Sequence, residues 1–213
     1  MKPYYEQDGI TIYHGDSVEI LNNLEVKADL LLTDPPYGIG SWSSTGGNSI
    51  TQEEADMINK WDVAPAKHHL EAMIAKARYS IVWGGNYFAG ELGSWRTPLI
   101  WDKAIRGMHF ADGELAWTNF DFGSLRIFNL PAASSDARGN RKHPTQKPVQ
   151  LMHWCIGLVK DVNLVIDPFM GSGTTLRAAK DLGIKAIGIE VEEKYCEIAA
   201  NRLAQGSLFA EID

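Results

Sequence analysis

The sequence contains little that would anchor, export or cross-link the chain. Its 213 residues include no apolar run near the roughly 20 residues that a membrane helix requires. The first residues, MKPYYEQDGITIYHGD, lack the apolar stretch of a signal peptide, so we expect a cytoplasmic protein without a membrane partner. Two cysteines, Cys155 and Cys196, have neither metal-ligand spacing nor a small-domain context that calls for a disulfide. We therefore expect reduced, buried thiols and no metal.

Positive charge is also scarce, because the formal net charge is −7. This balance is unusual for a protein that holds a polyanion. The charge is unevenly spread, however: residues 137–148 read ARGNRKHPTQKP and contain four bases and no acid. Such a segment on an acidic body can bind nucleic acid on one face. The alternative is a solvated loop, which composition alone favours.

Strand and helix patterns alternate along the whole chain. Buried or alternating apolar runs predict strands at residues 10–14, 28–33, 79–83, 98–102, 164–167 and 184–190. Helical periodicity and caps predict helices at residues 16–24, 52–60, 66–78, 148–159, 174–182 and 193–203. We expect a mobile loop at 38–50, a β-hairpin over 113–130 and disorder over 132–146. The alternation predicts an α/β fold, with a doubly wound, mostly parallel sheet in a single domain over residues 1–213.

A glycine turn follows one of the buried strands, in the segment DPFMGSGTT from Asp167 to Thr175. Gly171 and Gly173 let a ligand approach the backbone, and the following helix offers free N–H groups. Glu190, at the end of the next strand, has the spacing of an acid that accepts hydrogen bonds from a ribose. A phosphate-binding loop is disfavoured, because Thr-Thr-Leu follows the second glycine. A plain strand-to-helix turn remains the alternative for this motif.

The segment DPPY, residues 34–37, is more specific. Pro35 and Pro36 remove backbone donors and hold the chain extended, so nearby carbonyl oxygens are free to accept. The Asp34 carboxylate and such a carbonyl can accept both hydrogens of an exocyclic amine and expose its lone pair. Tyr37 can stack on a flat heterocycle. The alternative is a Pro-Pro turn that caps a strand.

Together, DPPY, DPFMGSGTT and HPTQKP (residues 143–148) closely resemble the N4/N6 amino-methyltransferases of DNA. DPPY precedes the glycine motif by about 130 residues, which resembles the permuted, beta-type order of that family. The segments YHGD, WGGNYF and LIWDK extend the resemblance over most of the chain. The family implies a Rossmann-like methyltransferase fold, with S-adenosyl-L-methionine as the cofactor and DNA as the partner.

The resemblance also implies roles for individual residues. Asp34 and the Pro35 carbonyl would bind the target amine beside Pro36, while Tyr37 would stack on the flipped base. Asp16 would bind the cofactor's adenine amino group and Glu190 its ribose. The other cofactor-binding residues would be Thr145, Lys147, Asp167, Pro168, Phe169, Gly171, Gly173 and Thr174, with Lys147 at the methionine carboxylate.

Only a short region, about 115–142, remains for target recognition. Family members with defined recognition sequences usually carry a larger one, so we expect short or relaxed specificity, or help from a second subunit in a homodimer. The small size resembles a solitary phage or prophage enzyme, although a partnering restriction enzyme stays open. The expected DNA contacts are Trp42, Lys103, Arg106, Arg138, Arg141 and Lys142.

Several activities remain compatible with these motifs. DPPY favours N6 of adenine, whereas a serine before the two prolines would favour N4 of cytosine. An RNA or small-molecule methyltransferase is a further alternative, to which the net acidity lends modest weight. The alternative of another class is a non-catalytic nucleic-acid-binding module, which the intact Asp34, Gly171 and Gly173 disfavour.

Overall fold

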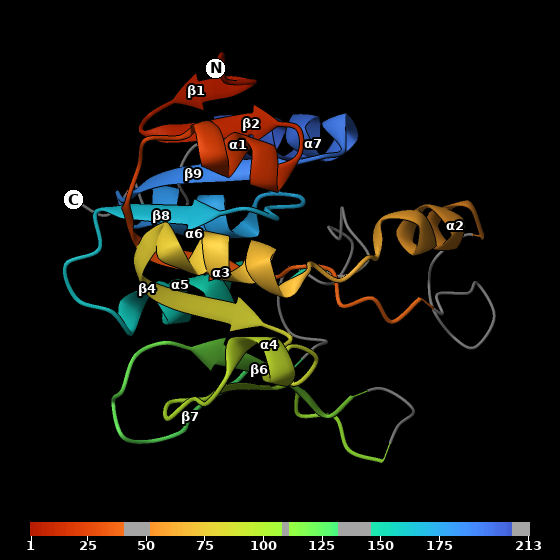
Figure 1. Cartoon of the computed structure of the whole chain (residues 1–213), viewed down its shortest axis with the longest axis vertical. Coiled ribbons are helices and arrows are strands. Elements are labelled where there is room, and N and C mark those ends of the chain that lie inside the picture. Colours follow the sequence, from red (N-terminus) through yellow and green to blue (C-terminus); the bar gives the residue numbers. More distant parts are fainter. Residues whose placement is uncertain (41–51, 108–110, 132–145, 206–213) are drawn as a thin grey trace.

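A computed structural model describes residues 1–40, 52–107, 111–131 and 146–205. The described strands form one sheet flanked by helices (Figure 1). Their order across the sheet is β1 (Tyr5–Gln7), β2 (Ile10–His14), β9 (Lys185–Glu190), β8 (Leu164–Asp167), β3 (Ala28–Thr33), β4 (Ala77–Trp83), β6 (Gly113–Thr118), β5 (Leu99–Asp102) and β7 (Arg126–Asn129).

The sheet is mostly parallel, which confirms the expected fold class. The neighbours from β2 through β9, β8 and β3 to β4 all pair in parallel, and β5 pairs with β7 in the same way. Among the described strands, β1 runs antiparallel to β2, and β6 runs antiparallel to both β4 and β5. The carboxyl ends of the parallel strands therefore meet at one edge, where ligands bind in open α/β sheets.

Helices cover both faces of the sheet. Successive residues of a strand point to opposite faces, so each buried strand contributes side chains to both layers of helices. In β3, Leu30 and Leu32 pack against the group formed by α5 (Val149–Gly157), α6 (Thr174–Asp181) and α7 (Glu193–Ala204). Leu31 points the other way, toward α1 (Ser17–Asn23) and α3 (Lys67–Ala75). Complete burial of all three leucines fits the expectation of a strand covered on both faces.

The remaining helices lie near one end of the strands. The short α4 (Ala89–Leu92) follows β4, and Phe88 at its start is buried in the cluster on the side of α1 and α3. By contrast, α2 (Gln52–Trp61) stands away from the sheet in Figure 1. None of the helices in the described segments has the length and apolar character needed to cross a membrane.

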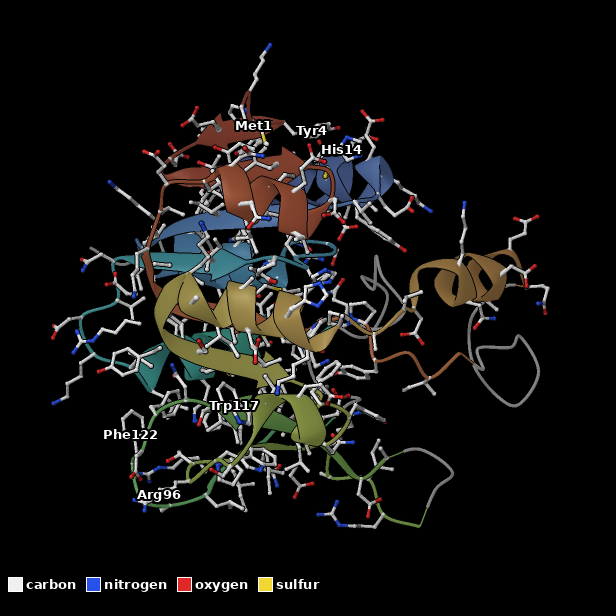
Figure 2. All side chains as sticks on the ribbon, in the orientation of Figure 1. Met1, Tyr4, His14, Arg96, Trp117 and Phe122 are labelled. Carbon is white, nitrogen blue, oxygen red and sulfur yellow. The ribbon has the colours of Figure 1, made fainter. Side chains whose placement is uncertain are left out.

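The prediction of a β-hairpin over residues 113–130 was wrong, because no such hairpin forms. The two strands of that region, β6 and β7, do not pair with each other, because β5 lies between them. Alternating residues and a glycine turn indicate two strands, but they do not specify the pairing partner. Trp117, labelled in Figure 2, is 6% exposed and pairs within the sheet, so the region expected for target recognition, from about 115, begins in a strand of the central sheet.

Two elements at the periphery were missed. The three-residue β1 extends the sheet at one edge, where the rings of Tyr4 and His14 meet edge to face with centroids 6.2 Å apart (Figure 2). The other is α4, which has only four residues. Both are too short for a periodic pattern. The expected state of the cysteines is confirmed, since Cys155 and Cys196 are free and buried.

Candidate active site

The residues of the two motifs come together at the carboxyl edge of the sheet. β3 ends at Thr33, immediately before Asp34, and β8 ends at Asp167 in the neighbouring position. The buried Thr33 hydroxyl donates to Asp167 Oδ1 across 2.8 Å, which ties the two strand ends together. β9, next to β8, ends at Glu190. The parallel order therefore places the DPPY segment beside the glycine turn.

The glycine turn leaves open space at one residue and close packing at the other. Gly171 has φ +50°, and a Cβ there would meet nothing within 4 Å, so a ligand can approach its backbone. Gly173 has φ +78° and forms the N-cap of α6. A Cβ on Gly173 would lie 2.8 Å from the Cβ of Ala199, so this glycine also lets α7 pack closely.

Glu190 faces the same turn. The backbone N–H of Gly171 donates to Glu190 Oε2 across 3.0 Å, and that of Glu192 donates to Oε1 across 2.9 Å. Burial raises the pKa of Glu190 to about 7, and these backbone donors oppose the rise. Each carboxylate oxygen has two lone pairs, so accepting one backbone bond leaves capacity for another donor.

Asp167 lies deeper than its neighbours in the motif. It is 3% exposed, and its Oδ1 accepts from Thr33 and, across 3.1 Å, from the backbone of Phe169. Burial raises its pKa to about 6, against the effect of its hydroxyl and backbone donors. In the structure Asp167 thus holds the turn onto the sheet. Pro168 and Thr174 are buried beside it, and Phe169 is half-buried.

Asp16 follows β2, the strand that pairs with β9 and places His14 opposite Glu190. Its side chain is exposed and caps α1: Oδ1 accepts from the backbones of Val18 and Glu19, each across 2.9 Å. This confirms the expected helix cap. The cap also fixes the carboxylate next to the strand that ends in Glu190.

The DPPY segment forms a shelf with Asp34 at its inner end. The Tyr37 hydroxyl donates to Asp34 Oδ1 across 2.5 Å. The Tyr37 ring stacks on that of Tyr87, with centroids 4.7 Å apart and an angle of 18°. A Cβ on Gly84 would lie 2.2 Å from Tyr37 Cε1, so only glycine admits the tyrosine at this place. Pro35 is buried and Pro36 half-buried.

A residue that the sequence did not single out fixes the chain after this shelf. The carboxylate of Asp62, which is 8% exposed, accepts from the backbone N–H groups of Gly38, Ile39 and Gly40 across 2.9, 2.9 and 3.0 Å. Three consecutive donors converging on one carboxylate hold the turn rigidly. Asp62 comes directly after α2, so no motif pointed to it.

The site also contains a row of side chains with alternating charge. The ammonium of Lys147, 6% exposed, contacts Asp34 Oδ2 and lies 2.9 Å from Glu114 Oε2. Lys103 pairs with the other oxygen of Glu114 across 2.6 Å. Sequence reasoning missed Glu114, because its importance depends on β6 running antiparallel, which brings the start of that strand to this edge.

Burial and ion pairing compete in this cluster. Burial raises the pKa of Asp34 above its usual value, and Lys147 limits the rise. Burial would raise the pKa of Glu114 too, but Lys147 and Lys103 lower it to about 2. Burial would lower the pKa of Lys147, yet Asp34 and Glu114 hold it well above its usual value. Glu114 and Lys147 are therefore ionised near neutral pH, and Lys147 favours the ionised form of Asp34.

This arrangement changes the expectations for three basic residues. Lys147 was expected at the cofactor's methionine carboxylate, but its ammonium is engaged by Asp34 and Glu114. Lys103 was expected on DNA, but its side chain is 17% exposed and paired with Glu114. Arg106 is 61% exposed and pairs with Asp102. Outside the described residues lie Trp42, Arg138, Arg141, Lys142 and Thr145.

Comparisons with known proteins identify the family. A family model described as DNA methylase, of the N6/N4 methyltransferases, matches residues 50–201. The type II methyltransferase M2.LlaDCHI of Lactococcus lactis subsp. cremoris is 27% identical over 98% of this chain and 94% of its own length. M2.MboI of Moraxella bovis is 29% identical over 95% of this chain and 91% of its own length.

Solved structures show the same fold. The crystal structure of the M1.HpyAVI–SAM complex has a TM-score of 0.59 at 22% identity and covers 92% of this chain and 100% of its own. The PvuII DNA methyltransferase, described as cytosine-N4-specific, has a TM-score of 0.65 at 19% identity, covering 100% of this chain and 91% of its own. Since the family model spans well over half of the sequence, the chain belongs to the N6/N4 DNA methyltransferases.

Proposed function

We propose that this DNA methyltransferase transfers the methyl group of S-adenosylmethionine to the N6 amino group of an adenine flipped out of DNA. The juxtaposition at the sheet edge carries the assignment of amine methylation, and the DPPY motif favours adenine over cytosine. The Asp34 carboxylate follows β3, and the Gly171 turn with Glu190 follows the adjacent strands. One residue set faces a target amine, and the other faces an adenosine.

The chain's own groups fit the cofactor. Open space at Gly171 admits a ligand against the backbone, and the first N–H groups of α6 point toward the same turn. Glu190 has remaining acceptor capacity for a ribose hydroxyl, and Asp16 lies where it can accept from the adenine amino group. The cofactor supplies an electrophilic methyl group on a sulfonium. Pro168, Phe169, Gly173 and Thr174 complete the cradle, and we assign Thr145 to its methionine end.

Asp34 prepares the amine for attack. Its carboxylate and the Pro35 carbonyl accept the two amine hydrogens, which draws the nitrogen toward tetrahedral geometry and frees its lone pair. Pro36 keeps this backbone extended. The freed lone pair would accept the methyl group that the cofactor supplies, and the nitrogen must then lose one proton. Asp34, already hydrogen-bonded to that nitrogen, is the acceptor within reach.

Tyr37 orients the base. Its hydroxyl is fixed on Asp34, and its ring is held by Gly84 and Tyr87. An aromatic ring fixed in this way provides a stacking surface for a flipped base, and stacking offsets part of the cost of flipping, which is a few kcal/mol.

DNA is bound, in this proposal, by Arg138, Arg141 and Lys142 and by the exposed Arg106, with Trp42 as a further contact. Lys103 is withdrawn from this set because its ammonium is paired with Glu114. The short region available for reading bases favours short or relaxed specificity. A second copy of the chain is a further source of recognition surface.

The test is a methyl-transfer assay with labelled S-adenosylmethionine on DNA and RNA, followed by nucleoside mass spectrometry. We expect N6-methyladenine in DNA. N4-methylcytosine would contradict the base assignment and favour the alternative that the cytosine-N4-specific PvuII enzyme represents. Methylated RNA alone would contradict the substrate, and cofactor binding without transfer would indicate a non-catalytic module.

A further inference from the structure

Both oxygens of Asp34 already have donors. The Tyr37 hydroxyl donates to Oδ1 and the Lys147 ammonium donates to Oδ2. The ammonium also lies 3.2 Å from the Tyr37 hydroxyl oxygen and 5.6 Å from the centroid of its ring. A target amine that approaches Asp34 above Tyr37 therefore meets a lysine that makes the same kind of N–H bond.

Lys147 has a second carboxylate within reach. Glu114 Oε2 lies 2.9 Å from its nitrogen, while Glu114 Oε1 is held by Lys103. The geometry of the Lys147–Glu114 contact is that of an ion pair, since Oε2 is buried without a well-directed hydrogen bond. Glu114 thus keeps an acceptor for Lys147 without needing to move, because Lys103 fixes its other oxygen.

We propose that, in the free enzyme, the Lys147 ammonium occupies the position on Asp34 that the target amine takes during the reaction. Glu114 is a positioning residue that receives the ammonium when the amine binds. This inference rests on the proposed function, in which Asp34 accepts from the amine. In the free enzyme the lysine stabilises the ionised form of the partly buried Asp34 carboxylate, which would otherwise be costly. During the exchange the ammonium stays between two carboxylates, so no charge becomes unpaired.

The arrangement predicts opposite electrostatic effects of the two partners on Asp34. The charged or titratable groups that face Asp34 are Tyr37 on its own segment, Lys147, Glu114 on β6 and Asp167 after β8. Removing the positive charge of Lys147 raises the pKa of Asp34. Removing the negative charge of Glu114 lowers that pKa, because a like charge disappears.

The first experiment follows the carboxyl carbon of Asp34 by NMR through a pH titration of the free protein, with the signal assigned by its loss in Asp34→Asn. Lys147→Gln should shift the titration to higher pH, and Glu114→Gln should shift it to lower pH. Lys185→Gln is the matched control, because this exposed lysine begins β9 at the opposite edge of the sheet. Shifts in the same direction, or none, would overturn the proposal.

The second experiment measures single-turnover methyl transfer to DNA at a pH near 8.5. Glu114→Gln should slow transfer on the order of tenfold, because Lys147 has lost its other carboxylate and stays on Asp34. The double variant Lys147→Gln/Glu114→Gln should be faster than Glu114→Gln alone, since the competing ammonium is gone. Additive losses would show that both residues only support the structure, and would contradict the exchange.

The affinity for the cofactor separates this proposal from the alternative that Lys147 binds the methionine carboxylate. By calorimetry, Lys147→Gln should leave the Kd for S-adenosylmethionine within about twofold, because Lys147 is assigned to Asp34. A loss of tenfold or more would place the lysine on the methionine carboxylate and overturn the proposal. A wild-type protein that binds the cofactor and methylates no DNA would instead refute the proposed function itself.

Discussion

Glu190→Gln should remove a pH dependence from cofactor binding. In the free protein, burial raises the pKa of Glu190 to about 7, so half of the molecules carry a neutral carboxyl at that pH. The ionised form keeps both oxygens as acceptors for the backbone donors and the ribose, whereas the neutral carboxyl uses one oxygen as a donor. Wild-type affinity for S-adenosylmethionine should therefore rise as the pH rises through 7.

The size of the effect follows from the fraction ionised. A group of pKa about 7 is about 9% ionised at pH 6 and about 91% ionised at pH 8, which gives about a tenfold gain in affinity. Glutamine cannot carry the charge, and its NH2 group opposes one of the backbone donors. We expect the variant to bind about 30-fold more weakly than the wild type at pH 8, or about 2 kcal/mol.

Isothermal titration calorimetry at several pH values between 6 and 8 measures both quantities. The cofactor's own amino group titrates in this range, but it does so with either protein, so the ratio of the two affinities isolates Glu190. Glu192→Gln is the control and should keep the wild-type pH dependence. A wild-type to variant ratio that stays constant with pH would refute the assignment of Glu190 to the ribose.

Three further predictions concern other parts of the site. Gly84→Ala should lower the rate of methyl transfer and keep the cofactor affinity. The added Cβ would lie 2.2 Å from the Tyr37 ring, and the φ of +77° strains alanine. An unchanged transfer rate would refute this packing. Neutralising the three bases of segment 138–142 should flatten the salt dependence of DNA binding, whose log–log slope is expected at about −3 to −4, and should lower the affinity for all DNA sequences alike. An unchanged slope would place the DNA elsewhere. Asp62→Ala should destabilise the chain in urea by about 2 kcal/mol, with Asp62→Asn between it and the wild type, since three backbone donors at 38–40 lose their acceptor.

The sequence predicted the parallel strands well because their signals are local. The strands at 10–14, 28–33 and 164–167 have the expected bounds, and Asp16 caps the helix that was expected to follow it. A continuous apolar run of this length, ending in a turn signal, suits a buried parallel strand and few other structures.

The pairing of β6 and the role of Glu114 could not be predicted in the same way. Both depend on which strand lies beside which, and alternation in the sequence carries no information on partners. The assignment of Lys147 failed to anticipate its ion pairs for the same reason, since Glu114 is distant along the chain and meets it only through the antiparallel β6. Asp62 has a purely tertiary role, because its backbone partners lie 22 to 24 residues earlier.

The central claim is that Asp34 serves the target amine and not the cofactor. The most direct measurement is the single-turnover rate of methyl transfer from Asp34→Asn that is saturated with S-adenosylmethionine, with the Kd for the cofactor measured on the same sample. The account predicts a rate lower by on the order of 100-fold or more, because a transition-state partner is lost, with a Kd that changes by less than about threefold. A variant that transfers methyl groups at the wild-type rate, or that loses the cofactor instead, would contradict it.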